Sequence, residues 1–167
     1  QGETRKVGLF APNLVRLDQF DEIKRAPGVK EAISRKDEIA LCVTSMGEAT
    51  DEQDLLSQFL REESPEAYDT MCEKRNYVGN IQYRPYSSSG PIEEESTDYR
   101  AVTLFELEEL RRIAQQKSRE VILMAARKRA ASVLPLLTIP SLRVFSYLVM
   151  DRNTAEGVLK AHKKRIA

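Results

Sequence analysis

The spacing of hydrophobic residues changes within residues 99–134, and this change predicts a short strand followed by helices. In the first six residues of the segment, Val102 and Leu104 fall on one face, which is the period of a half-buried strand. Beyond them, apolar residues recur every three to four positions, as in an amphipathic helix. Ser118 then stands where it can cap a second helix that runs through Ala130.

Hydrophobic patterns on either side of this segment predict further elements. Residues 38–46 alternate like a strand and form the best strand in the first half of the chain. Thr50 opens a capping box for one helix, and Ser64 with Pro65 begins another. Near the end of the chain, residues 140–149 have helical spacing, and Asn153 or Thr154 is placed to cap a last helix.

The central segment resembles the ribbon-helix-helix family of bacterial DNA-binding transcription regulators, over about a fifth of the chain. The resemblance is carried by the strand Val102-Thr103-Leu104, the helix at 108–114 and the residues 118–122 that open the next helix. It implies a homodimer whose paired strands form a ribbon in the major groove of double-stranded DNA.

Each implied DNA contact has a role set by its position in this arrangement. Side chains of the ribbon that face away from the helices would meet base edges, and the start of the second helix would hold a phosphate. Basic residues further on would add an attraction that does not depend on sequence. The predicted DNA-binding residues are Tyr99, Arg100, Ala101, Thr103, Ser118, Arg119, Arg127, Lys128 and Arg129.

Charge is distributed unevenly although the chain is neutral overall. Residues 1–98 carry 12 Lys and Arg against 20 Asp and Glu, and residues 99–167 carry 14 against 6. Such asymmetry is typical of an anion-binding segment beside an acidic one. Two oppositely charged lobes that attract each other would give the same pattern.

Composition also suggests how the chain divides. Residues 87–98 are polar, acidic and poor in apolar side chains, which predicts a flexible linker. We therefore expect an acidic α+β lobe at 1–86 and a basic ribbon-helix-helix-like and helical domain at 99–167. The acidic lobe would have a regulatory role or bind a protein partner.

The sequence offers little catalytic chemistry. His162 is the single histidine, and Cys42 and Cys72 lack the flanking spacing of metal ligands. The glycines are scattered, and none precedes a phosphate-binding Lys-Ser or Lys-Thr. We expect no enzyme activity, no cofactor and no metal site. With no signal peptide and no long apolar run, we expect a cytoplasmic protein without membrane contact.

Two functions remain open on this reading. The first is a bacterial or plasmid regulator of transcription that binds DNA as a homodimer. The second is a helical assembly protein without DNA binding, because nothing in residues 105–133 breaks a helix and its apolar residues fit a heptad. In either case the predicted fold class is mainly α with a few short strands (α+β), with a ribbon-helix-helix-like core at 99–134 and helical extensions.

Overall fold

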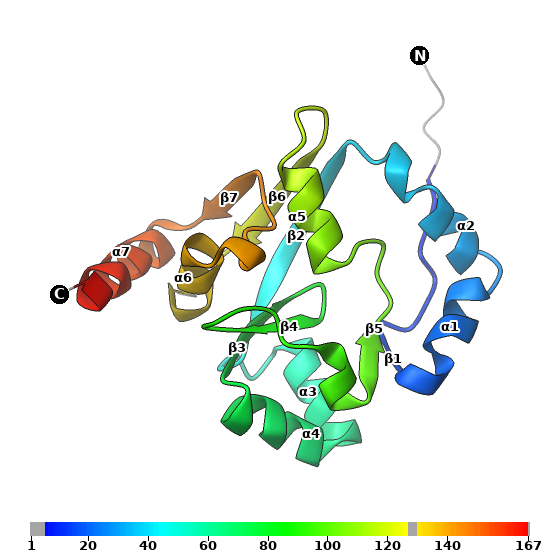
Figure 1. Ribbon diagram of the computed structural model, residues 1–167, viewed down its shortest axis with the longest axis horizontal. Coiled ribbons are helices and arrows are strands. Elements are labelled where there is room, and N and C mark those ends of the chain that lie inside the picture. The colour runs from blue at the N-terminus through cyan, green and yellow to red at the C-terminus, as the bar shows by residue number, and fades with distance from the viewer. Residues whose placement is uncertain (1–5, 127–129, 167) are drawn as a thin grey trace.

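A five-stranded mixed sheet forms the centre of the molecule (Figure 1). The computed structural model describes residues 6–126 and 130–166. The strand order is β4-β3-β2-β6-β7. Strands β2, β6 and β7 are parallel, whereas β3 is antiparallel to both β2 and β4. The five strands are β2 (Leu41–Glu48), β3 (Tyr77–Ile81), β4 (Arg84–Ser87), β6 (Glu120–Ala125) and β7 (Tyr147–Met150).

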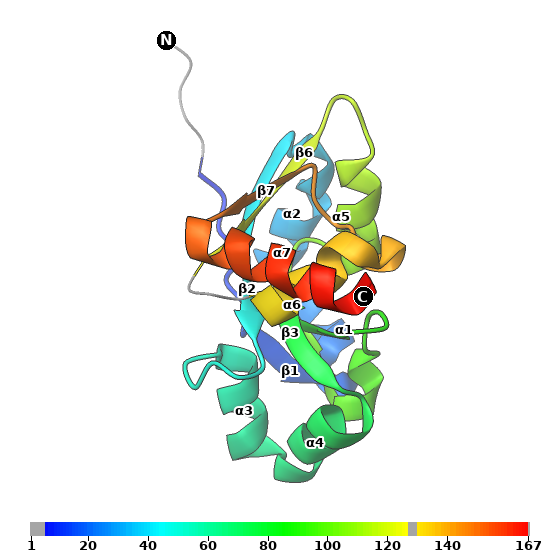
Figure 2. The ribbon, with the colours of Figure 1, turned by 90° about the vertical axis from the view of Figure 1, so that its left-hand side faces the viewer.

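A second, two-stranded sheet lies beside the first. It pairs β1 (Leu14–Arg16) with β5 (Tyr99–Ala101) in antiparallel register. Figures 1 and 2 show this small sheet near the first two helices. The described helices are α1 (Leu17–Arg25), α2 (Val29–Ser34), α3 (Leu55–Glu63), α4 (Pro65–Asp69), α5 (Leu107–Ala114), α6 (Ala130–Thr138) and α7 (Arg152–Ile166), joined in places by short 3-10 or π turns.

The two faces of the large sheet differ in their cover. On one face, Val121 and Leu123 of β6 are fully buried in a core that they share with Leu110 of α5 and Leu136 of α6. On the other face, five apolar side chains are each about half exposed, although sheets with parallel strands are usually covered on both sides. These are Leu41, Val43, Met124, Tyr147 and Val149. No described helix is long and apolar enough to cross a membrane.

The predicted fold class is wrong, because the chain is an α/β fold rather than a mainly α one. The largest error concerns the segment after Ser118, where a strand, β6, replaces the expected helix. Five of its six residues are apolar, and its buried and exposed residues largely alternate. An apolar run of this length fits either a central strand or a buried helix. The alternative of one long helix over 105–133 is wrong for the same reason.

The helix expected at 140–149 is also absent. Pro140–Leu142 form a single 3-10 turn, and Tyr147–Met150 form strand β7. Strand β7 adds to the sheet edge beside β6, with Leu123 opposite Leu148. The last helix is confirmed as α7, but Asp151 caps it: the Asp151 carboxylate accepts hydrogen bonds from the Thr154 backbone N–H and hydroxyl, both at 2.9 Å.

The predicted intermolecular ribbon is not available in this fold. Strand β5 falls within the strand expected at 99–104, but it pairs within the same chain, with Leu14 opposite Ala101 and Arg16 opposite Tyr99. The backbone groups that would have paired with a second chain are therefore engaged by β1. The ribbon-helix-helix resemblance fails at this strand and again at the second helix.

The two oppositely charged halves of the chain share one sheet. Strand β2 comes from the half expected to be an acidic lobe, and β6 comes from the basic half, yet residues 41–45 pair with residues 120–124. Between them, the segment expected to be a linker buries Ser87, Ile92 and Thr97. The structure thus connects the expected lobes at 1–86 and 99–167 through their central strands.

Candidate functional site

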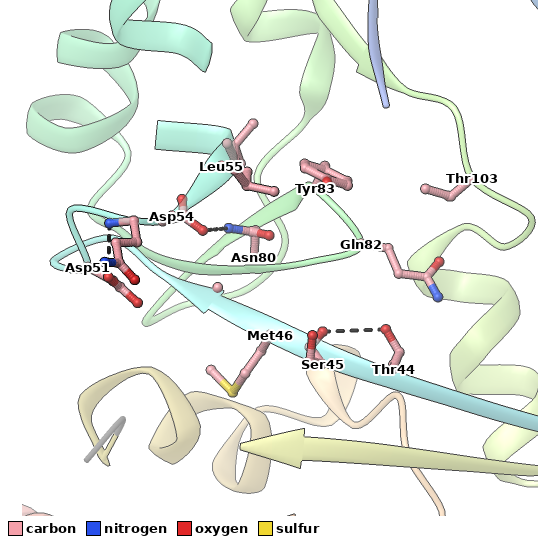
Figure 3. Close-up of a pocket in the computed structure, with 13 residues that line it drawn as sticks. Thr44, Ser45, Met46, Asp51, Asp54, Leu55, Asn80, Gln82, Tyr83 and Thr103 are labelled. Carbon is pink, nitrogen blue, oxygen red and sulfur yellow. Dashed lines mark hydrogen bonds between the residues drawn. The ribbon is translucent and has the colours of Figure 1, made fainter. Parts of the chain in front are cut away.

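A cavity of about 420 Å³ opens where β2 changes its pairing partner (Figure 3). Residues 41–45 of β2 pair with β6, whereas residues 46–48 pair with β3. The wall comes from the second half of β2, the loop before α3, the turn between β3 and β4, and one residue after β5. Its polar side chains are those of Thr44, Ser45, Asp51, Gln53, Asp54, Asn80, Gln82, Tyr83 and Thr103.

Gly47 allows the chain to fold tightly at the edge of this cavity. A Cβ atom at this position would lie 2.0 Å from Oδ1 of Asp54 and 2.4 Å from Nδ2 of Asn80. Both of those groups are buried, so neither has room to retreat. A glycine here therefore brings the start of α3 close to β2 and β3.

Asp54 fixes the wall of the cavity through a set of neutral hydrogen-bond donors. It is the N-cap of α3: its Oδ2 accepts from the backbone N–H of Ser57 at 2.9 Å and from the Ser57 hydroxyl at 2.7 Å. The same oxygen accepts from the Tyr77 hydroxyl at 3.1 Å, and Oδ1 accepts from Nδ2 of Asn80 at 2.8 Å. Burial, together with the charge of Asp54, raises the pKa of Tyr77 well above its usual range. Tyr77 thus stays a neutral donor.

The β3–β4 turn places Gln82 and Tyr83 at the cavity in a strained conformation. Both residues have positive φ, 51° and 63° respectively, which is the pattern of a type I′ hairpin turn that normally selects Asn and Gly. The Tyr83 hydroxyl is anchored by Nδ2 of Asn13, which donates to it at 2.8 Å. Oε1 of Gln82 is buried and has no hydrogen-bond partner among the described residues. Strained residues of this kind often mark functional sites.

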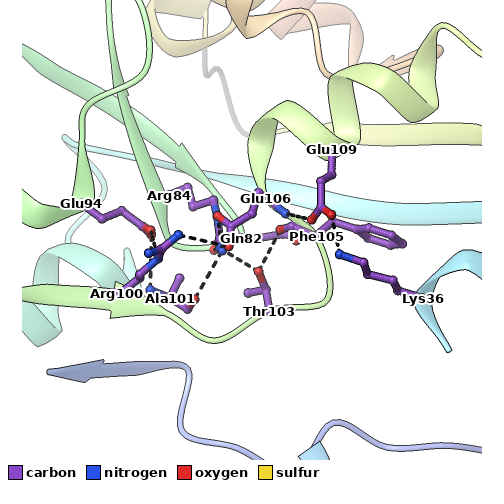
Figure 4. Close-up of polar contacts among 10 residues, drawn as sticks. All are labelled: Lys36, Gln82, Arg84, Glu94, Arg100, Ala101, Thr103, Phe105, Glu106 and Glu109. Carbon is purple, nitrogen blue, oxygen red and sulfur yellow. Dashed lines mark hydrogen bonds and ion pairs between the residues drawn. The ribbon is translucent and has the colours of Figure 1, made fainter. Parts of the chain in front are cut away.

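A second polar cluster supports the cavity from behind (Figure 4). Arg84, only 3% exposed, donates to Oε2 of Glu106 and to Oγ1 of Thr103, each at 2.7 Å. It also donates to the backbone oxygen of Ala101 at 3.3 Å. The Thr103 hydroxyl in turn donates to the Phe105 carbonyl at 3.0 Å. Arg84 thereby holds Thr103, which lines the cavity, in one orientation.

The two carboxylates of this cluster have opposite pKa shifts. Burial opposes ionisation of Glu106, but the hydrogen bond and charge of Arg84 outweigh it and lower its pKa. Burial dominates at Glu94 and raises its pKa to about 7, with the positive charge of Arg84 acting against it. Glu94 also accepts from the Ala101 backbone N–H at 3.3 Å and lies 3.6 Å from Nε of Arg100.

Most of the residues predicted to contact DNA have structural roles instead. Ala101 is fully buried, and the buried ring of Tyr99 packs edge-to-face on Phe59 with centroids 5.0 Å apart. The guanidinium of Arg100 lies 4.5 Å from the centroid of the Phe20 ring and pairs with Glu94. These side chains are used within the fold, so they do not form a base-reading surface.

The other predicted contacts lie in two different places. Ser118 is exposed in the turn before β6, where it caps no helix. Arg119 donates to the backbone oxygens of Ile39 and Lys36 at 2.9 and 3.0 Å, which ties this turn to the segment before β2. Arg127, Lys128 and Arg129 lie outside the described residues. Of the whole predicted set, Thr103 alone lines the cavity.

Sequence reasoning missed most of the cavity because its residues come from distant segments. The tyrosines of residues 77–86 were interpreted as cover for a core edge, which hid the hairpin that ends in Gln82 and Tyr83. The cap of α3 was placed at Thr50, whereas Asp54 caps a helix that begins at Leu55. The available signal was an Asp three residues before a serine at the start of an apolar stripe. Within the described part of the chain, no group of three metal-ligating side chains is close enough to hold a metal ion.

The chain shares its fold with domains of bacterial transcription regulators, although its sequence alone identifies no relative. No protein-family model and no curated protein matches the sequence. Among solved structures, it is similar to a candidate sugar-binding domain of a transcriptional repressor from Vibrio fischeri. The TM-score is 0.71 at 18% identity, over 93% of this chain and 58% of that one.

Two further structures show the same likeness. One is a DeoR family transcriptional regulator from Listeria monocytogenes, with a TM-score of 0.67 at 15% identity, over 90% of this chain and 57% of that one. The other is the full-length sorbitol operon regulator SorC from Klebsiella pneumoniae, with a TM-score of 0.65 at 20% identity, over 84% of this chain and 42% of that one. The chain thus spans about half the length of the structures it matches.

Proposed function

We propose that this chain is the ligand-sensing part of a transcription regulator and that it binds a small polyhydroxylated ligand, a sugar or sugar alcohol, in the cavity at the end of β2. The observation that carries the proposal is a polar cavity at this position in a fold shared with a domain assigned to sugar binding. Open α/β sheets commonly bind ligands in crevices beyond the carboxyl ends of their strands.

The chemistry of the lining suits a ligand with many hydroxyl groups. Thr44, Ser45 and Thr103 offer hydroxyls, and Gln53 and Gln82 offer amides, so both donors and acceptors surround the cavity. The carboxylate of Asp51 adds a strong acceptor for ligand O–H groups. A volume of about 420 Å³ lies within the usual range for small-molecule sites.

Regulation of transcription would then follow from ligand binding rather than from base reading by β5. Ligand contacts on both β2 and the 49–54 loop would favour one arrangement of the loop over others, and that preference would be passed to the rest of the regulator. DNA binding and oligomer formation by the whole protein are part of this proposal, as is the absence of catalysis. Direct insertion of β5 into DNA is not, since β1 occupies its edge.

Thermal unfolding with a panel of sugars and sugar alcohols at millimolar concentration tests the proposal. A ligand present at about 100 times its Kd stabilises the folded state by about 2.7 kcal/mol. We expect at least one member of the panel to raise the Tm, and isothermal titration to give one site per chain.

Blocking the cavity provides the matched control. Ser45→Phe places a ring in the cavity mouth from an exposed position on β2, and it should abolish the ligand-induced rise in Tm. Ser118→Phe makes the same change at an exposed serine in the turn before β6, so it should leave the rise intact. No stabilisation by any panel member, or equal loss in both variants, would count against the cavity as a sugar site.

A further inference from the structure

A second cavity adjoins the first and shares two of its walls. It has a volume of about 350 Å³ and is bounded by Leu55 and Tyr83, which also line the first cavity. Its other residues come from the start of β1 and from the outer side of α3. They are Pro12, Asn13, Leu14, Gln58, Phe59 and Glu62. The two spaces therefore lie on either side of one leucine and one tyrosine.

The shared tyrosine is held in place, while the shared leucine is unusually exposed. The Tyr83 hydroxyl accepts a hydrogen bond from Asn13 at 2.8 Å, which ties the β3–β4 turn to the residue preceding β1. Leu55 is the first residue of α3 and is 57% exposed. In Figure 3 it stands beside Tyr83 at the edge of the first cavity. An exposed leucine between two cavities is well placed to contact an apolar group that spans them.

The linings of the two cavities differ in chemistry. The first presents hydroxyl, amide and carboxylate groups from β2 and the β3–β4 turn. The second adds the apolar surfaces of Pro12, Leu14 and Phe59 to those of Leu55 and Tyr83. A ligand that fills both must then be polar at one end and apolar at the other.

We propose that the ligand is a glycoside with an apolar substituent, bound with its sugar in the first cavity and its aryl or alkyl group in the second. The inference rests on the proposed sugar-binding function and specifies its ligand class. The sugar's hydroxyls meet Ser45, Gln82 and Thr103, and the substituent passes between Leu55 and Tyr83 to reach Phe59. A free sugar or a methyl glycoside leaves the second cavity unused.

Matched pairs of methyl and phenyl glycosides of the same sugars test this class by titration calorimetry on the full chain. Burying a phenyl group against apolar side chains should make the phenyl compound bind about tenfold more tightly than its methyl counterpart. The readout is the ratio of the two Kd values, because any loss common to both compounds cancels. Equal affinity of the two compounds would overturn the inference and leave the sugar site intact.

Leu55→Ala tests where the advantage arises. Since Leu55 is largely exposed, the variant should fold, and the Kd ratio should fall from about ten to about three or less. Phe59→Leu is a second variant at the far wall and should lower the ratio as well. Leu159→Ala, at a leucine of α7 that is 62% exposed and lines neither cavity, should leave the ratio unchanged.

The outcomes separate the two proposals. A wild-type ratio that neither Leu55→Ala nor Phe59→Leu lowers would place the substituent elsewhere and overturn the inference alone. Absence of binding by every glycoside, free sugar and sugar alcohol would overturn both the ligand class and the sugar-sensing function. A ratio that falls in the two cavity variants and not in Leu159→Ala supports both.

Discussion

Two polar clusters flank the β3–β4 hairpin, and they solve the problem of buried charge in different ways. Around Asp54, one buried carboxylate is surrounded by neutral donors from Ser57, Tyr77 and Asn80. Around Arg84, a buried cation meets an acidic partner, Glu106. The first cluster caps a helix and leaves its charge uncompensated beside the cavity. The second balances its charges and fixes a cavity residue from behind.

The difference indicates how each cluster contributes to the site. A carboxylate satisfied by four donors is rigid, because moving it would break several hydrogen bonds at once. The Asp54 cluster therefore sets the shape of the cavity. The Arg84 cluster connects β4, the segment after β5 and the N-terminus of α5 through Thr103 and Glu106. A displacement of the ligand's contact at Thr103 would thus be felt at α5.

The largest effect is expected from removal of the Asp54 carboxylate. Asp54→Ala loses the cap of α3 and leaves the Tyr77 hydroxyl and the Asn80 amide buried without their acceptor. We expect the free energy of unfolding to fall by about 4 kcal/mol, the sum of a lost cap and two unsatisfied groups. Urea unfolding followed by circular dichroism measures the loss.

Two comparison variants sharpen this prediction. Asp54→Asn keeps the shape and one acceptor oxygen, so it should lose about half as much stability as Asp54→Ala. Asp51→Ala, in the same loop, should lose about 1 kcal/mol or less, because its Oδ1 accepts only a local exposed hydrogen bond from the Gln53 backbone in addition to its other contacts. Equal losses at the two aspartates would mean that the buried network does not stabilise the fold.

Arg84→Met should have the next largest effect. It removes the partner of Glu106 and the donor to Thr103 while keeping the buried apolar stem. Breaking a buried ion pair destabilises by about 3–5 kcal/mol, and the partial exposure of Glu106, 34%, reduces this to about 2–3 kcal/mol. The measurement is again the free energy of unfolding in urea.

The paired variant Arg84→Met with Glu106→Leu separates the stranded charge from the lost contacts. If most of the penalty comes from Glu106 left without its cation, the double variant should be more stable than Arg84→Met. A double variant as unstable as the sum of the single ones would instead show that the two side chains act independently, and the contrast between the clusters would disappear.

Local signals predicted part of this structure. Strand β2, the start of α4 at Pro65, the helix α5 and the last helix follow from hydrophobic period and capping residues, and all are present. Even where a strand was right, its orientation was not. Leu41 and Val43 fall on one face as predicted, yet that face is exposed, at 50% and 55%. A period of two identifies a face without saying what covers it.

The remaining errors concern contacts between distant segments. Whether β5 pairs with a second chain or with β1 is decided by residues 85 positions away, which no local pattern reports. In the same way, β6 becomes a strand because β2 and β7 lie on either side of it. The cavity joins residue 44 to residue 103, so only the assembled sheet brings its lining together. Composition alone made the segment 87–98 look like a linker, although it contributes buried residues.

The smallest predicted effect is a pH dependence that arises at Glu94 in the Arg84 cluster. The pKa of Glu94 is about 7 in the folded chain, against an ordinary value of 4.5. The folded state therefore binds a proton that the unfolded state has already released between these two values. Stability from this group is full below pH 4.5, declines as the pH rises toward 7, and levels off above it. The total change is on the order of 2 kcal/mol, since burial of the carboxyl is incomplete.

Glu94→Gln isolates this contribution from that of other carboxylates. The amide still accepts from the Ala101 N–H but does not ionise, so the variant should lack the decline between pH 4.5 and 7. At pH 8 it should be more stable than the wild type, and at pH 4.5 the two should be nearly equal. Glu106 and Glu109, whose pKa values are lowered, act in the opposite direction and only at lower pH, where their stabilisation is lost. Parallel pH profiles for the variant and the wild type would show that Glu94 ionises normally, and the buried charge balance assigned to the Arg84 cluster would then be wrong.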